Sequence, residues 1–211
     1  MKYDYFYTFE EIDFNECTDM EFDAVYSGIS VRLTPNFNVD RKFGTHIHRL
    51  NNVRIDVSAV YNPVTGDIGM YYNVSDENGS QGREYIMTDE ERSTVAQYIE
   101  KMCIEKYEMT CTEYYITRYA EHYGDNINLE CRQEGDAYII YNVNDGAVLY
   151  QEDLNGDLYE HIGHEIELAN YGNGECYSIE CMDCEEVIYS SDIERIELQD
   201  IEDNDGMEML M

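Results

Sequence analysis

Apolar and polar residues alternate along much of the first third of the chain, and this period of two predicts β-strands. Tyr3, Tyr5, Tyr7 and Phe9 alternate with polar residues and predict a first strand. Further strands are expected at 28–34, 53–61 and 67–74. The turn composition of 62–66 predicts that the last two form a hairpin. We expect 35–38, which begins with a proline, to end the second strand, and 76–82 to form a loop.

The middle of the chain changes to a helical period. Thr88 and Glu91 have the spacing of a capping box, in which each side chain bonds the backbone of the other residue. Apolar residues then recur three and four positions apart, which predicts a helix over about 89–107. A second helix is expected at about 110–123.

The final third returns to short strands separated by turns. Asn144, Asp145 and Gly146 predict a hairpin between 137–143 and 147–150. Turns are expected at 155–157 and 171–174, with strands at 176–181 and 186–189. The segment 192–201 fits either a helix or a strand, and 203–206 is expected to fray into a tail.

Short turns and the grouping of helices apart from strands favour an α+β fold with antiparallel pairing. We expect an antiparallel sheet in the N-terminal half, one or two central helices at about 88–123, and a β-rich acidic C-terminal half. A change of charge near 124–126 suggests a region 1–125 of mixed α+β structure and a region 126–211 that is acidic and β-rich. Whether these are one domain or two is left open.

Composition indicates a folded chain without a membrane segment. The chain has 211 residues, of which 43% are hydrophobic, so a sizeable core is available. No run approaches 18 apolar residues, and the N-terminus lacks the basic start and apolar run of a secretory signal. We therefore expect a cytoplasmic protein. Its seven cysteines, an odd number, should then be reduced thiols.

Charge is the most informative feature of the sequence. Lys and Arg number 13 against 46 Asp and Glu, a net charge of −33. Residues 121–211 hold 25 of these acids and only two bases, Arg132 and Arg195, a net charge of −23. Such charge disfavours direct binding to nucleic acid or to an anionic membrane. A cationic partner, bound metal ions or high salt would offset the repulsion.

The segregation of this charge predicts a binding surface for a basic protein. A surface of carboxylates can occupy a groove that Lys and Arg line for phosphates. We expect the partner to be a nucleic-acid-binding enzyme, a nuclease above all. Acidic mimics in phage and mobile-element counter-defence, the anti-restriction and anti-CRISPR proteins, bind their targets by the same physical means. The analogy is with this class of proteins and does not rest on a sequence match. The expected contact residues are acidic side chains with interleaved tyrosines: Glu165, Glu167, Glu180, Asp183, Glu185, Glu186, Asp192, Glu194, Glu197, Asp200, Tyr177 and Tyr189.

One alternative is adaptation to high salt with an unrelated function. Four Lys against nine Arg, with a large acid excess, fit that explanation. However, adaptation should acidify the whole surface, whereas residues 1–60 hold 10 acids and 6 bases.

A second alternative is a small zinc-binding domain. Two histidines and three cysteines form its candidate ligand set: His161, His164, Cys176, Cys181 and Cys184. A single Cys-x-x-Cys lacks the matching second pair of a zinc site, so the sequence does not favour this reading, and no cofactor is expected. The acidic run 153–157 departs from the calcium-loop pattern, because Leu158 stands where that pattern needs glycine.

Signatures of catalysis are missing from the sequence. There is no Gly-rich phosphate loop, no Gly-x-Ser-x-Gly and no His-Glu-x-x-His. The one locally basic stretch, 41–54, is expected to pair with acids of the same chain. We therefore expect a binding protein and not an enzyme.

Overall fold

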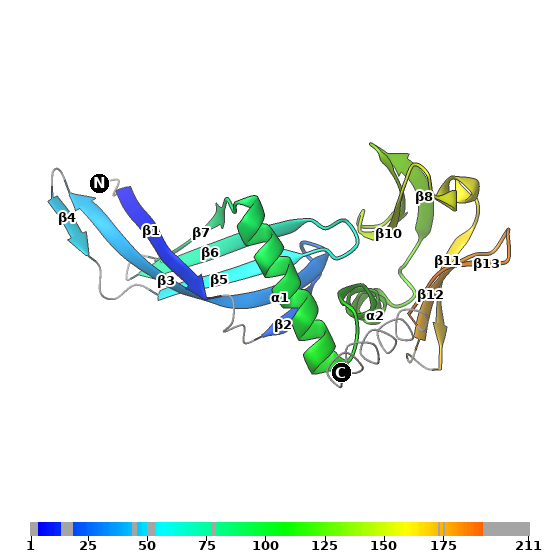
Figure 1. Cartoon of the computed structure of the whole chain (residues 1–211), viewed down its shortest axis with the longest axis horizontal. Helices are drawn as coiled ribbons and strands as arrows, with labels where there is room; N and C mark the ends of the chain where they lie inside the picture. The colour runs from blue at the N-terminus through cyan, green and yellow to red at the C-terminus, as the bar shows by residue number, and fades with distance from the viewer. Residues whose placement is uncertain are drawn as a thin grey trace, which may run out of the picture. The chain divides into compact units, whose positions relative to one another are not determined.

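The computed structural model describes residues 4–13, 19–43, 46–49, 54–76, 79–172, 174 and 176–191. The chain forms two compact units. The first comprises residues 1–61 and 67–99, and the second comprises 62–66 and 100–211. Each unit contains one antiparallel sheet, and two helices lie between the two groups of strands in the sequence (Figure 1). The expected α+β class with antiparallel sheets is confirmed.

Seven strands make the N-terminal sheet, and the long strand β3 is its organising element (Figure 1). β3 pairs with four other strands, and β5, β6 and β7 extend the sheet on one side. The strands are β1 (Asp4–Asp13), β2 (Met20–Asp23), β3 (Gly28–Phe43), β4 (His46–Arg49), β5 (Arg54–Tyr61), β6 (Ile68–Asp76) and β7 (Gly79–Tyr85).

Strand β3 continues through Pro35, so the predicted break at 35–38 is wrong. Pro35 pairs with Ile12 of β1, while β5 pairs with β3 only at 29–33 and β4 only at 40–43. Among the described strands, β3 thus has a single neighbour at Pro35. A proline has no backbone N–H to donate. A strand tolerates it where the edge that this N–H would face has no hydrogen-bonded neighbouring strand.

Alternation along β3 and β5 separates an apolar face from a polar face. Ile29, Val31 and Leu33 are all buried, whereas Arg32 between them is exposed. Burial of one face and solvation of the other is typical of antiparallel sheets.

The expected hairpin between 53–61 and 67–74 is confirmed as β5 and β6. Asn62 shapes its turn, because its Oδ1 accepts hydrogen bonds from the backbone N–H groups of Val64 (2.9 Å) and Thr65 (3.2 Å). The expected loop at 76–82 is wrong in part, because β7 begins at Gly79 and pairs with β6. Glu77 and Asn78 lie outside the described residues.

The two helices, α1 (Asp89–Tyr107) and α2 (Cys111–Tyr123), agree closely with the sequence prediction. The capping box is present in full. The backbone N–H of Thr88 donates to Glu91 Oε2 at 2.7 Å, and the N–H of Glu91 donates to Thr88 Oγ1 at 3.2 Å. Across the part of the chain that is described, neither helix has the length and apolarity needed to cross a membrane.

Six strands make the C-terminal sheet, in the order β10-β9-β8-β11-β12-β13. A short 3₁₀ helix, η1 (Asp157–His161), precedes β11. The hairpin expected around 144–146 is confirmed as β9 and β10. The turn expected at 171–174 falls between the paired strands β11 and β12, although Asn173 lies outside the described residues. The strands are β8 (Leu129–Glu134), β9 (Ala137–Asn142), β10 (Val148–Asp153), β11 (Ile166–Tyr171), β12 (Cys176–Cys181) and β13 (Glu186–Ser190). The segments 192–201 and 203–206 lie outside the described residues.

A buried polar network joins helix α2 to the C-terminal sheet. The Tyr119 hydroxyl donates to the carboxylate of Asp145 at 2.9 Å and accepts from Asn142 Nδ2 at 2.6 Å. Tyr119 and Asn142 are both fully buried. The Tyr115 hydroxyl donates to the carbonyl of Val148 at 3.3 Å. These bonds keep α2 with the strands that follow it, so the compact units divide the chain earlier than the expected boundary at 124–126.

Replacing Tyr119 by Phe should lower the free energy of unfolding by about 1–3 kcal/mol, because the buried amide of Asn142 loses its acceptor. Urea denaturation followed by circular dichroism measures this change. Tyr171→Phe is the control, since its hydroxyl bonds Glu180 at the surface. Equal small losses in both variants would contradict the importance of the buried network.

Burial raises the pKa of Tyr115 and of Tyr119 above 10, and Asp145 raises both further. The folded state therefore holds these phenol protons at pH values where the unfolded chain releases them. Their contribution to stability is complete below pH 10 and is lost as the pH rises above it. Stability measured from pH 8 to 11.5 should fall more gently in Tyr119→Phe than in the parent protein. Equal slopes of stability against pH in the two proteins would contradict a raised pKa of Tyr119.

Candidate functional site

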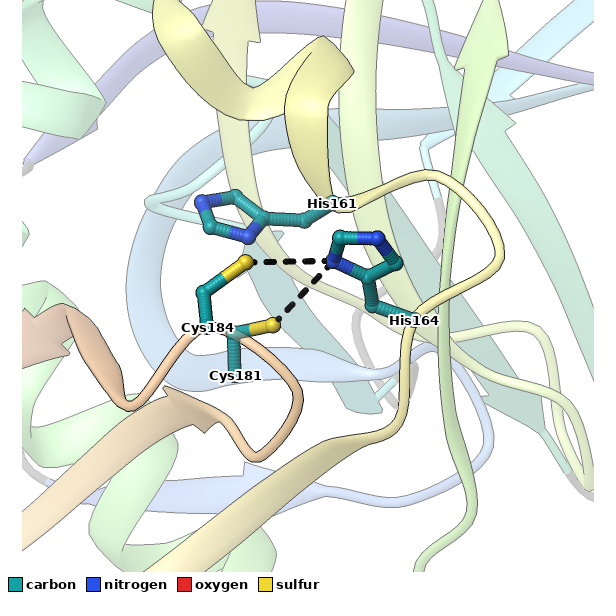
Figure 2. A group of neighbouring side chains, drawn as sticks. All are labelled: His161, His164, Cys181 and Cys184. Atoms are coloured by element: carbon teal, nitrogen blue, oxygen red, sulfur yellow. Dashed lines mark hydrogen bonds between the residues drawn. The ribbon is translucent and has the colours of Figure 1, made fainter.

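Four potential metal ligands meet at one end of the C-terminal sheet. They are His161, His164, Cys181 and Cys184, and one ligand atom from each lies within 4.8 Å of every other (Figure 2). Nδ1 of His164 lies 3.5 Å from the Cys181 sulfur and 3.2 Å from the Cys184 sulfur. The two imidazole rings are nearly perpendicular, at 74°. The two thiols and two imidazoles therefore converge on one point.

Two tight connections bring these side chains together. His161 ends η1, and His164 lies in the connection to β11. Gly163 between them has φ of +82°, a backbone conformation that glycine adopts without strain. Cys181 ends β12, and Cys184 lies in the turn that leads to β13. The backbone N–H of His164 donates to the His161 carbonyl at 3.1 Å and closes the first connection.

His161 is the best-defined member of the group. Its side chain is buried, and its Nδ1 has no hydrogen-bond partner among the described residues. Its Nε2 lies 3.6 Å from Glu186 Oε2. Figure 2 shows the other ring nitrogen pointing toward the sulfur of Cys184. A buried polar atom without a partner is costly, so this nitrogen calls for a ligand that the protein itself does not supply.

The set of donors matches the preferences of a tetrahedral ion. Structural zinc sites use four ligands from Cys and His, with bonds of about 2.0–2.3 Å, which places the ligand atoms about 3.3–3.8 Å apart. The separations of 3.5 and 3.2 Å around His164 are close to this range. The pKa of Cys184 is raised to about 11 by its hydrogen bond with Cys181, by desolvation and by nearby acids. A metal ion that binds here would displace that proton.

Cys176 does not belong to the group, so its inclusion among the candidate ligands is wrong. It is buried at the start of β12, where its sulfur lies 3.4 Å from the Ser191 hydroxyl. The candidate ligands already included His161-x-x-His164, but the sequence interpretation did not count this pair as the match for Cys181-x-x-Cys184. Reading the two equal spacings together would have found the site. Nothing in the spacing identifies Glu186 as the partner of His161.

An acidic face lies on the same part of the sheet. Glu165 and Glu167 are exposed, while Ile166 between them is buried. Glu167 pairs directly with Glu180 of β12 in the strand register. Asp183 joins the group, because its Oδ2 accepts the backbone N–H of Glu165 at 2.9 Å. We call these four residues, Glu165, Glu167, Glu180 and Asp183, the acidic face.

The remaining expected contact residues are distributed differently. Tyr177 and Tyr189 are each only 7% exposed, so their expected role as surface contacts is wrong. They are core residues of β12 and β13, because strand residues whose side chains face inward supply the apolar area that the sheet buries. Glu185 is exposed in the turn after Cys184, and Glu186 faces His161. Asp192, Glu194, Glu197 and Asp200 lie outside the described residues.

A second acidic feature lies in the N-terminal unit, and the sequence interpretation missed it. The polar face of the sheet holds a hollow of about 750 Å³. Tyr26 and Tyr71 stack at its side with ring centres 4.8 Å apart, and Arg32 pairs with Asp19 at 3.6 Å. Its other acidic lining residues are Glu21, Asp23, Asp56 and Glu84. The polar positions that alternate along β3, β5 and β6 were the available signal. The side chains of the basic stretch 41–54 lie outside the description.

Comparisons with protein-family models, with curated proteins and with solved structures find no match to this chain.

Neutralising Glu167 should stabilise the protein, because two carboxylates directly opposite each other on neighbouring strands repel. Glu167→Gln should raise the free energy of unfolding by about 0.2–1 kcal/mol at low salt. The gain should shrink at 0.5 M salt, where screening weakens the repulsion. Asp136→Asn, in the turn between β8 and β9, is the control for a simple change of net charge. An equal gain from both variants would contradict a specific pair.

Proposed function

We propose that this chain is a non-catalytic acidic protein that binds the basic nucleic-acid-binding surface of a partner protein, and that the partner is a nuclease. The exposed acidity of the second unit carries the proposal. Between 124 and 191 the description includes a single Lys or Arg, Arg132, which pairs with Glu134 and stacks 4.0 Å from the ring of Tyr141. The exposed carboxylates are those of Asp125, Glu130, Glu134, Asp136, Asp145, Asp153, Asp157, Glu160, Glu165, Glu167, Asp183, Glu185 and Glu186.

The arrangement of the acidic face supports this function. Alternate residues on a strand lie about 7 Å apart, and neighbouring strands lie about 4.8 Å apart. Glu167 and Glu180 therefore lie side by side on neighbouring strands, and Glu165 immediately precedes β11. A duplex presents one phosphate per ~3.4 Å of axis on each strand, and its binders line their grooves with Lys and Arg. A dense array of carboxylates on a sheet offers such a groove comparable charge.

The unfavourable pairing of Glu167 with Glu180 also supports a cationic partner. Like charges that face each other across strands destabilise the free protein. A partner Arg or Lys placed between them would convert this repulsion into attraction. Local interactions that destabilise the free protein, such as this repulsion, are typical of functional sites.

The proposal predicts inhibition of a nuclease that depends on the acidic face. A panel of restriction and RNA-guided DNA nucleases is titrated with the protein at 50 and 150 mM salt. One nuclease should be inhibited near stoichiometric dose, and the inhibition should weaken as salt rises. The triple variant Glu165→Gln, Glu167→Gln, Asp183→Asn should lose about tenfold or more in affinity, which corresponds to about 1.4 kcal/mol. Glu180 is left intact because it accepts a hydrogen bond from Tyr171.

The matched control makes the same change of charge in the N-terminal hollow, with Glu21→Gln, Asp56→Asn and Glu84→Gln. This control should retain nearly all of the inhibition. Equal losses from the two triple variants would show that only net charge matters. Weak and equal protection from every nuclease in the panel would refute the proposed function.

A further inference from the structure

We propose that His161, His164, Cys181 and Cys184 bind one Zn²⁺ ion as a closed structural site in the second unit. The inference stands on the geometry of these four residues and is independent of the proposed function. It assigns a metal to a chain whose sequence alone favoured none.

Convergence of the four ligand atoms is the first observation. They come from two connections that are far apart in sequence, yet they lie within 4.8 Å of one another. Nδ1 of His164 already approaches both sulfurs, at 3.5 and 3.2 Å (Figure 2). A tetrahedral ion needs only small shifts of these side chains.

The second, independent observation is the Nδ1 atom of His161. This nitrogen is buried, and the described residues provide it with no hydrogen-bond partner. His161 as a whole is only 6% exposed, so water does not readily reach this nitrogen. An ion coordinated by Nδ1 would supply the missing partner. A chance cluster of surface side chains would not contain a buried nitrogen without a partner.

The donors select zinc and a structural role. Thiolate and imidazole ligands in a tetrahedral S₂N₂ set favour zinc, whereas calcium and magnesium require oxygen ligands. Catalytic zinc sites keep one position for water, with three protein ligands. Here the protein supplies four ligands, so the coordination shell is closed.

Glu186 completes the site from outside the coordination shell. Its Oε2 lies 3.6 Å from Nε2 of His161, on the side of the ring away from the unpartnered Nδ1. Metal-binding histidines commonly donate their second N–H to a carboxylate, which fixes the tautomer and the ring orientation. Glu186 is therefore a positioning residue for His161.

The ion would join the connection that follows η1 to the turn between β12 and β13. Two hydrogen bonds also join these segments: Met182 N–H donates to the Glu165 carbonyl at 2.9 Å, and Glu165 N–H donates to the Asp183 carboxylate at 2.9 Å. Zinc would therefore hold in place the end of the sheet that bears Glu165 and Asp183.

Metal content of the full chain tests the site. The protein is purified without chelator and without an immobilised-metal column, and its metals are measured by mass spectrometry. One equivalent of zinc per chain is expected, and Cys184→Ser and His164→Ala should each lose most of it. The matched controls are Cys176→Ser and His122→Ala, which lie outside the group and should retain zinc. Less than a tenth of an equivalent in the parent protein, or a stoichiometric metal other than zinc, would overturn the proposal.

Cobalt substitution tests the coordination even if a variant fails to fold. Co²⁺ added to chelator-treated parent protein should give the intense visible bands of a tetrahedral ion together with thiolate charge-transfer absorption. Zinc removal should lower the melting temperature by about 10 °C or more, because a ligand that binds only the folded state stabilises it. An octahedral cobalt spectrum, with an unchanged melting temperature, would contradict a closed site.

Substitution of Glu186 tests its positioning role. Glu186→Gln should weaken zinc affinity by about 10–100-fold in competition with a chromophoric chelator, while the tetrahedral cobalt spectrum persists. Glu185→Gln removes a neighbouring exposed charge and should change the affinity much less. Equal effects of the two variants would show that Glu186 acts only through net charge.

Discussion

Repulsion between carboxylates is the constraint on which the structure of the second unit depends. Residues 121–211 carry 25 acids and two bases, so ordinary ion pairs are too few to neutralise them. Tyrosine hydroxyls stabilise some of these carboxylates in another way, since a phenol donates a hydrogen bond to a carboxylate and adds no negative charge of its own. The observed pairs are Tyr119 with Asp145, Tyr141 with Glu130, Tyr150 with Glu152, Tyr159 with Glu160, and Tyr171 with Glu180. These hydrogen bonds to carboxylates explain why tyrosine is abundant in so acidic a chain.

The same constraint gives the four-residue Cys and His cluster its significance. A divalent cation held by two thiolates leaves the cluster itself neutral, yet it fixes backbone segments that carry Glu165 and Asp183. Those carboxylates cannot move apart to relieve their repulsion once both connections are held. A rigid acidic face attracts a basic groove more strongly than a flexible tail does, because less conformational freedom is lost on binding. The proposed metal site and the proposed binding function thus support each other, although each has its own evidence.

Local patterns predicted much of the fold because they depend on neighbours in sequence. The capping box at Thr88 and Glu91, the hairpin turn at Asn62 and the strand at 176–181 all follow from interactions within a few residues. Errors arose where a strand's partner decided the outcome. Pro35 remains within β3 because that stretch has one neighbouring strand, and 79–82 join a strand because β6 is available to pair. The partner of Pro35, Ile12, is distant in the sequence, whereas β6 is adjacent to 79–82 and its pairing with them depends on the tertiary fold.

The sequence by itself determined the net charge, its concentration in the final third, the two central helices and the alternation that buries one face of β3. Tertiary structure alone decided which side chains meet. It removed Cys176 from the ligand group, placed Tyr177 and Tyr189 in the core, and set Glu186 beside His161. The reason is physical: charge and periodicity are properties of the chain, whereas a coordination site needs atoms from distant segments at distances that only strand register and turn geometry establish.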